Sequence, residues 1–151
     1  MGQIMSAAEW QVMRVIWAYP GHTSSQIIAS LQEGFDWQAT TIKTLLGRLR
    51  KKAYLEMKKE EGQYHYYPLV AEKEHLQQQL QMLLDTICST KHGEVVGQLL
   101  EMGSFSYSDL EKLRHQIDYQ LLTAPQHLQC HCLAGQCTCH HHEGRNQYAD
   151  D

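Results

Sequence analysis

Two short apolar stripes at helical spacing occupy the first part of the chain. Each is preceded by the spacing of a capping box, a Ser or Thr followed three residues later by Glu or Gln, whose side chains satisfy unpaired amides at a helix start. The first helix is expected to stop at Tyr19-Pro20-Gly21 and the second near Gly34. The capping pairs are Ser6 with Glu9 and Thr23 with Gln26, and the stripes are Trp10, Met13, Ile16 and Trp17, then Ile27, Ile28 and Leu31.

A third helix is predicted from about Ala39 to Lys52. Its apolar residues fall at positions i, i+3, i+4 and i+7, so they form one stripe that can be buried. The opposite face is polar and basic, and Gln38 stands where a small capping residue is expected. The buried stripe is Ile42, Leu45, Leu46 and Leu49, and the opposite face is Thr40, Thr44, Gly47 and Lys51, flanked by Lys43 and Arg48.

Two short strands are expected next, at residues 54–59 and 63–67, joined by Glu60-Glu61-Gly62. Beyond Pro68 the pattern changes to long helices with one apolar stripe each, which one monomer cannot bury without a partner. The order of three helices and a hairpin is that of a winged helix-turn-helix. The later stripes are Leu76, Leu80, Leu83, Leu84 and Ile87, then Val95, Val96, Leu99 and Leu100, then Leu110, Leu113, Ile117 and Leu121 after a capping box at Ser108 and Glu111.

We therefore expect a mainly α fold with a small β-hairpin wing, divided into three parts. Residues 1–70 form a winged helix-turn-helix domain that binds DNA, residues 71–124 form a helical dimerisation region, and residues 125–151 form a metal-binding tail rich in Cys and His. No apolar run approaches the roughly 18 residues that a membrane span needs. The N-terminus also lacks an export signal, so we expect a cytoplasmic protein with no membrane partner and with reduced thiols.

Charge is distributed unevenly, although the whole chain has a net charge of −4. Residues 1–70 carry eight Lys and Arg against six Asp and Glu, whereas the remainder carries five against eleven. From Lys43 to Lys59, seven basic residues stand against Glu56 alone. This local excess is a candidate footprint for the phosphates of DNA.

A charged helix face by itself is usually only solvated, but two preceding short helices and a basic hairpin favour a recognition helix. Chemistry and reach make Lys43, Thr44 and Arg48 candidates for contacts to base edges. Gly47 would allow the backbone to approach that of the DNA. The expected phosphate contacts are Arg50, Lys51, Lys52, Lys58 and Lys59, and the whole expected set adds Thr40, Thr41, Lys43, Thr44, Gly47 and Arg48.

Two Cys-x-Cys pairs lie within ten residues of the tail: Cys130 with Cys132, and Cys137 with Cys139. A one-residue spacer brings sulfurs near enough to bridge adjacent ions, which favours the soft ion Cu(I). Zn(II) bound by the same four thiolates stays feasible. Two disulfides or an inert tail are the alternatives. Outside this tail the sequence shows no set of acid, base and nucleophile, so an enzyme is not expected.

The fifth cysteine and the histidines are given structural or solvent-exposed roles. Cys88 continues the stripe of Leu80, Leu84 and Ile87, which favours a small buried side chain over a ligand. Thiolates outcompete imidazole for Cu(I), so the tail histidines are expected to stay solvated. Those histidines are His127, His131, His140, His141 and His142, and the scattered ones taken as structural are His22, His65, His75, His92 and His115.

With these residues in view, the chain resembles the BlaI/MecI/CopY family of winged-helix repressors, and specifically its copper-responsive branch. The resemblance covers nearly the whole chain, and the two Cys-x-Cys pairs separate the copper branch from the antibiotic-responsive one. The other matching segments are Ser6-Ala7-Ala8-Glu9-Trp10, Val12-Met13, Ile16-Trp17, Trp37, the run from Thr41 to Leu49 and the wing strand from Tyr64 to Pro68.

The resemblance implies a homodimeric repressor on an inverted-repeat operator. It also implies that the Zn(II) form binds DNA and that Cu(I), delivered by a copper chaperone, displaces zinc at the four tail cysteines and releases genes for copper export. Three alternatives stay open: a copper-buffering protein that never touches DNA, a β-lactam-responsive repressor and a thiol-redox repressor. The stretch Gly103-Ser104-Phe105, which corresponds to the cleavage region of antibiotic-responsive relatives, is a poor match.

Overall fold

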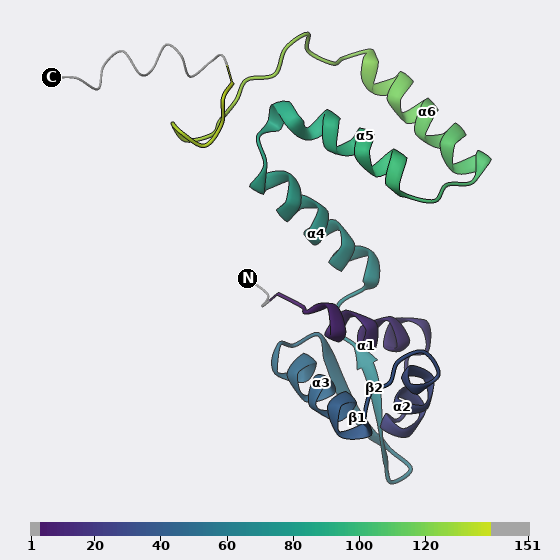
Figure 1. Ribbon diagram of the computed structural model, residues 1–151. Coiled ribbons are helices and arrows are strands. Elements are labelled where there is room, and N and C mark those ends of the chain that lie inside the picture. The colour runs from purple at the N-terminus through teal and green to yellow at the C-terminus, as the bar shows by residue number, and fades with distance from the viewer. Residues whose placement is uncertain (1–3, 140–151) are drawn as a thin grey trace, which may run out of the picture. The chain divides into compact units, whose positions relative to one another are not determined.

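The computed structural model describes residues 4–139 (Figure 1). The chain divides into two compact units, Met1–Gln78 and Gln79–Asp151. The elements, in chain order, are α1 (Ala7–Ala18), α2 (Ser24–Gln32), α3 (Ala39–Lys51), β1 (Leu55–Glu60), β2 (Gln63–Pro68), α4 (Glu72–Thr86), the single 3-10 turn η1 (Ser89–Lys91), α5 (His92–Met102) and α6 (Tyr107–Leu121).

In the first unit, three helices and a hairpin enclose one apolar core, and the predicted fold class is confirmed. The capping boxes predicted for α1 and α2 both form, so their starts are set by side-chain hydrogen bonds. α3 begins after Gln38 without a side-chain cap, as that residue's chemistry suggested. The core includes Val12, Met13, Ile16, Ile27, Leu31, Leu55 and the predicted α3 stripe, Ile42, Leu45, Leu46 and Leu49.

The wing is the antiparallel hairpin of β1 and β2, in which Leu55 pairs with Pro68. Its turn is shorter than the predicted three residues, because Glu60 already belongs to β1. Glu61 and Gly62 both have positive φ, which matches a two-residue turn of the type that suits the twist of a hairpin. The β2 strand is also tied to the segment before α2, through hydrogen bonds of its Tyr66 backbone with residues 21 and 22.

The start of α4 belongs to the first unit and packs on α1. His75 is fully buried among the rings of Trp10, Trp17 and Tyr54, at centroid distances of 4.5, 5.8 and 5.6 Å. The indole N–H of Trp17 donates to the carbonyl of Val70 at 2.8 Å. The first unit therefore extends past the hairpin into the first turns of α4.

The second unit contains α5, α6 and the tail, and none of the residues in α5 or α6 is buried. The capping box expected at Ser108 and Glu111 is wrong, because Ser106 and Asp109 form it instead. Two Ser-x-x-acid spacings overlap here, and the earlier one starts the helix. None of the helices in residues 4–139 combines the length and apolarity needed to cross a membrane. The domain boundaries proposed at 70 and 124 stay predictions.

Candidate metal centre and nucleic-acid interface

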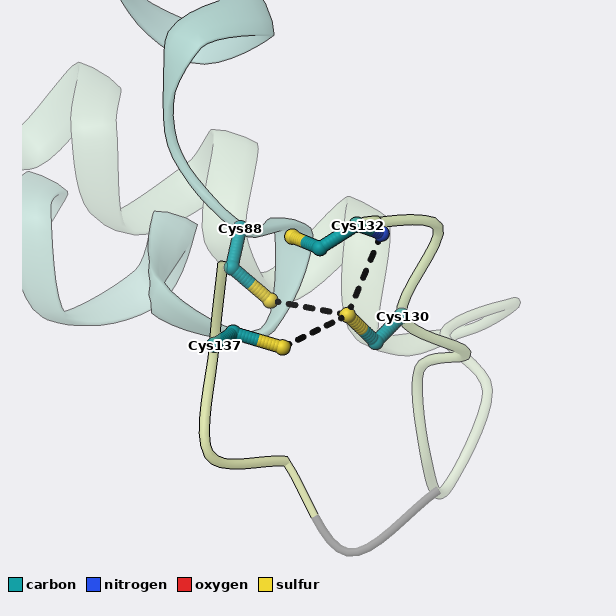
Figure 2. Close-up of side chains that lie close together, drawn as sticks. All are labelled: Cys88, Cys130, Cys132 and Cys137. Carbon is teal, nitrogen blue, oxygen red and sulfur yellow. Dashed lines mark hydrogen bonds between the residues drawn. The ribbon is translucent and has the colours of Figure 1, made fainter. Parts of the chain in front are cut away.

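Four cysteine side chains converge in the second unit, and we call them the thiol cluster (Figure 2). Cys130, Cys132 and Cys137 come from the tail, whereas Cys88 comes from the turn between α4 and η1. The four sulfur atoms all lie within 4.8 Å of one another. The sulfur of Cys130 is 3.4 Å from that of Cys88 and 3.3 Å from that of Cys137. All five cysteines lie in residues 4–139, and none of them forms a disulfide there.

Cys139 lies beside the thiol cluster, with its sulfur 3.4 Å from that of Cys88 and 3.2 Å from the hydroxyl of Thr90. The same hydroxyl is 3.0 Å from the sulfur of Cys88. At the start of the cysteine segment, the hydroxyl of Ser89 donates to the carbonyl of Gln129 at 3.0 Å. The tail is thus attached to η1 at both ends of its cysteine-containing segment.

The surroundings shift the pKa values of two cluster thiols in opposite directions. The hydroxyl and the backbone amide of Thr90 lower the pKa of Cys88 to about 6. The amide of Cys132 favours the thiolate of Cys130, but burial and the neighbouring sulfurs outweigh it and raise the pKa of Cys130. Thiolates this close repel one another, so the whole set can ionise only when a cation neutralises it.

The donor set fits a thiophilic cation. A tetrahedral ion with metal–sulfur bonds of about 2.3 Å places its sulfurs about 3.8 Å apart. The separations of 3.3 and 3.4 Å within the thiol cluster lie within a few tenths of an ångström of that value. Thiolate is also the ligand that soft Cu(I) prefers. The thiol cluster can therefore hold a metal ion, and both Zn(II) and Cu(I) suit its chemistry.

The structure corrects the interpretation of Cys88. α4 ends at Thr86, so Cys88 does not continue the helical stripe, although its side chain is buried as expected. Its sulfur faces that of Cys130 in the tail, although the two residues are 42 positions apart in the sequence. The missed signal was local: Ser89 and Thr90 follow at once, and such residues favour turns and helix starts over a helix interior.

The tail histidines are placed only in part. His131 lines a cavity of about 320 Å³ together with Cys132 and with His92 of α5. His127 is exposed. The predicted solvent role of these two stays a prediction, and His140, His141 and His142 lie outside the described residues.

α3 presents a polar face opposite its buried stripe, and this face is the candidate nucleic-acid interface. A Cβ added at Gly47 would meet no atom within 4 Å, so this position opens directly onto the surface. The hydroxyl of Thr44 donates to the carbonyl of Thr40 at 2.9 Å, which leaves its oxygen lone pairs for a ligand. The exposed residues of α3 from the predicted set are Thr40, Thr41, Lys43, Thr44, Gly47, Arg48, Arg50 and Lys51.

Lys52 has a structural partner that the sequence analysis did not anticipate. Its ammonium donates to the carboxylate of Glu9 at 2.7 Å and to the carbonyl of Ile4 at 2.8 Å. Burial opposes the ionisation of Glu9, but the hydrogen bonds from Lys52 and from the amide of Ser6 outweigh it and lower the pKa of that carboxyl. The ion pair neutralises part of the charge of Lys52, and its contact with a DNA phosphate stays a prediction.

The wing lysines are exposed, as the hairpin pattern suggested. Lys58 forms an ion pair with Glu56 at 3.1 Å and lies 5.0 Å from the ring centroid of Tyr67. Lys59 lies 6.0 Å from the ring centroid of Tyr64. Both ammonium groups remain accessible to an anion at the surface, since exposed pairs of this kind are weak.

A winged helix-turn-helix with a basic third helix, followed by helices and a thiol cluster, defines a class of transcription regulator with a candidate metal site. The penicillinase repressor family matches residues 5–119, and the chain belongs to this family. Its members are DNA-binding transcriptional repressors and not enzymes, so this chain is a repressor of the BlaI/MecI type.

Two relatives span most of the chain, and a solved structure spans about half of it. An uncharacterized 16.5 kDa protein in the ptsI 3′ region of Latilactobacillus sakei is 34% identical, over 92% of this chain and 95% of its own length. The methicillin resistance regulatory protein MecI of Mammaliicoccus sciuri is 31% identical over 74% of this chain and 90% of its own. The solution structure of monomeric Bacillus licheniformis BlaI with the blaP half-operator is 34% identical, covers 49% of this chain and 90% of that one, and has a TM-score of 0.45.

Proposed function

We propose that this chain is a copper-responsive transcriptional repressor that acts in the cytoplasm. As a homodimer holding Zn(II), it binds an inverted-repeat operator, and it leaves the operator when Cu(I), delivered by a copper chaperone, displaces the zinc. The genes released are those of copper export. The observation that carries the proposal is the convergence of tail thiols in a member of a repressor family.

The metal part of the proposal rests on the donor set. Cys130, Cys132, Cys137 and Cys139 supply two Cys-x-Cys pairs, whose one-residue spacers suit bridging of adjacent Cu(I) ions. The same tail can supply thiolates to the four-coordinate site that Zn(II) prefers. Cu(I) then serves as the inducer and Zn(II) as the resident ion.

Support for a homodimer comes from the surface of the second unit. Soluble monomers rarely expose contiguous apolar patches larger than a few hundred Å². Here α4, α5 and α6 all leave large apolar side chains exposed at helical spacing, which a second copy of the chain would cover. Those that lie in the second unit include Leu80, Leu83, Val96, Leu99, Leu110 and Ile117.

DNA binding is assigned to the exposed face of α3 and to the wing. Lys43, Thr44 and Arg48 would contact base edges, and Arg50, Lys51, Lys52, Lys58 and Lys59 would contact phosphates. Arg48→Ala should then relax the discrimination between operator and unrelated DNA. Lys51→Ala should weaken binding to every sequence and reduce the slope of log affinity against log salt by about one. Titrations at two salt concentrations separate the two effects, and the reverse pattern overturns the assignment.

The deciding experiment compares operator affinity in three metal states of the reduced protein: metal-depleted, loaded with Zn(II), and loaded with Zn(II) and then titrated with Cu(I). We expect tight binding with Zn(II) and release with Cu(I), and Cys130→Ser and Cys139→Ser should both damage that response. A coupling of about 1–3 kcal/mol between metal and DNA changes affinity about 5- to 150-fold. Equal affinity in all three states contradicts the proposal.

The remaining alternatives give different results in the same experiment. A copper-buffering protein would bind Cu(I) and protect no promoter fragment. A thiol-redox repressor would lose its operator on oxidation without metal, and the short sulfur separations of the thiol cluster would permit such disulfides. A β-lactam-responsive repressor would ignore both metals.

A further inference from the structure

The tail cysteines do not complete the thiol cluster by themselves. Three of them lie within 4.8 Å of one another, and the fourth sulfur within that limit is that of Cys88. Cys139 stands outside the set, although its sulfur is 3.4 Å from that of Cys88. Five thiols are thus present where a tetrahedral ion binds four.

We propose that Cys88 is the fourth zinc ligand, with Cys130, Cys132 and Cys137, and that loading of Cu(I) on the two Cys-x-Cys pairs recruits Cys139 and releases Cys88. This inference rests on the proposed function and adds the residue through which the metal centre acts on the helices. Figure 2 shows the sulfur of Cys88 directed at that of Cys130, which also faces the sulfur of Cys137.

Geometry favours Cys88 over Cys139 for the tetrahedral ion. Zinc sites usually combine ligands from separate segments, because a tetrahedron has to be closed from more than one side. Two Cys-x-Cys pairs from one short loop close it only with strain. Cys88 approaches from the turn after α4 and needs no movement of the tail, since its sulfur already lies 3.4 Å from that of Cys130.

The exchange balances without an oxidant or reductant. Zn(II) leaves as its bonds to the sulfurs of Cys88, Cys130, Cys132 and Cys137 break, and two Cu(I) ions take its place, so that the charge of the bound metal is unchanged. The freed Cys88 thiolate exchanges protons with solvent. The Cys139 thiol gives up a proton and its sulfur forms bonds to copper. Four thiolates remain bound in either state, so the charge of the ligand set stays the same.

The release of Cys88 would affect the corner between α4 and α5, which is the turn at residues 87–91. Cys88 stands in that corner, and a hydrogen bond of 3.0 Å between the ring of His92 and the carbonyl of Leu84 joins the two helices across it. With zinc bound, Cys88 ties the tail to this corner by a metal–sulfur bond. Copper loading removes that bond from helices that carry the proposed dimer surface.

The first test uses the unaltered protein. Under reducing conditions, alkylation of each cysteine is followed by peptide mass spectrometry in the metal-depleted, Zn(II) and Cu(I) forms. We expect Zn(II) to slow alkylation of Cys88 about 10-fold or more relative to the metal-depleted form, and Cys139 to stay reactive. With Cu(I), Cys139 should become protected and Cys88 reactive. Equal Cys88 rates with and without zinc overturn the ligand role, and protection of Cys88 by copper overturns the release.

The second test compares Cys88→Ser with the matched variant Cys139→Ser. Co(II) serves as a spectroscopic probe for zinc, because its thiolate charge-transfer absorption grows with each bound sulfur. Cys88→Ser should lower that absorption by roughly a quarter, as one of four thiolates is lost, and weaken Zn(II) binding about 10-fold or more. Cys139→Ser should leave the cobalt spectrum unchanged. Equal spectra for Cys88→Ser and the unaltered protein contradict the proposal.

The two proposals can fail separately. The zinc and cobalt measurements need no DNA, so Cys88 can prove to be no ligand while copper still releases the operator. Conversely, an operator that is held equally in every metal state removes the regulatory function and leaves the ligand assignment standing. Melting curves of the metal-depleted variants check that serine at position 88 has not disrupted the second unit.

Discussion

The two units of this chain are stabilised in different ways. The first unit buries a continuous core between three helices and a hairpin, and the starts of α1 and α2 are fixed by side-chain caps. In the second unit, α5 and α6 bury none of their residues, and the buried Cys88 belongs to the thiol cluster. The comparison shows a unit with its own buried core joined to a unit whose helices α5 and α6 leave their apolar side chains unburied.

The largest loss of stability is expected for a substitution in the fully buried core of the first unit. Leu49→Ala removes a fully buried side chain of α3 and should destabilise the first unit by about 3 kcal/mol. Leu99→Ala removes a half-exposed side chain of α5 and should leave the first unit unchanged. Urea unfolding followed by tryptophan fluorescence measures this directly, because Trp10, Trp17 and Trp37 all lie in the first unit.

Leu99→Ala should instead weaken self-association, since Leu99 belongs to the apolar surface proposed to be shared by two copies. Sedimentation at several protein concentrations would show this as a shift toward monomer. A large loss of first-unit stability in Leu99→Ala would mean that the two units are not independent.

Removal of metal should destabilise the second unit and leave the stability of the first unit almost unchanged. Zinc at a hundred times its dissociation constant stabilises the state that binds it by about 2.7 kcal/mol. A chelator should therefore lower the unfolding temperature of the second unit, measured by far-UV circular dichroism, and leave the tryptophan transition almost in place. A parallel shift of both signals would show that zinc stabilises the whole chain.

The ion pair between Lys52 and Glu9 tests a smaller part of the first unit. Glu9→Gln leaves the partly buried ammonium of Lys52 without its counter-charge and should cost about 2 kcal/mol at neutral pH. Because the pKa of Glu9 is lowered on folding, its contribution is present above the ordinary value of 4.5 and is lost as the pH falls through the folded pKa. The variant should lack this acid dependence. Glu56→Gln, at the exposed pair with Lys58, serves as the control and should change stability little.

The same contrast explains how far the sequence could be interpreted. In the first unit, local rules agree with one another: capping boxes, apolar periodicity and turn residues predicted α1, α2, α3 and the wing to within one or two residues. One long-range contact there, the ion pair between Glu9 and Lys52, was not predicted. Glu9 was assigned only a capping role, and Lys52 only a surface role, because a pair separated by 43 residues leaves no periodic signal.

In the second unit, two capping-box spacings overlap, and an apolar stripe in the sequence continues past the end of its helix. Ser106 and Ser108 both precede an acid by three residues, and spacing does not distinguish them. Cys88 was assigned to a helical stripe because Ile87 and Leu84 precede it, yet α4 stops at Thr86. Its approach to the tail follows from tertiary structure, which the four tail cysteines, grouped in sequence, gave no reason to expect.

The smallest expected effect on stability concerns His75, a buried polar residue near the end of the first unit. Both of its ring nitrogens are buried and lack hydrogen-bond partners among the described residues. His75→Phe keeps a ring among Trp10, Trp17 and Tyr54 and removes two unsatisfied polar atoms. We expect it to stabilise the first unit by about 1 kcal/mol at pH 7.5, measured by tryptophan-detected urea unfolding. Destabilisation would show that an imidazole is required in this ring cluster.

The pH dependence sharpens the same prediction. Burial lowers the pKa of His75 below its ordinary value of 6.5, so the unfolded chain binds a proton that the folded chain rejects. His75 therefore weakens the fold further as the pH falls through 6.5, and this proton-linked cost, unlike that of the unsatisfied nitrogens, is absent well above that value. The advantage of His75→Phe should accordingly grow between pH 7.5 and pH 5.5. His115→Gln, at an exposed position of α6, should leave this profile of the first unit unaltered, and an equal effect of both variants would assign the pH dependence to another group.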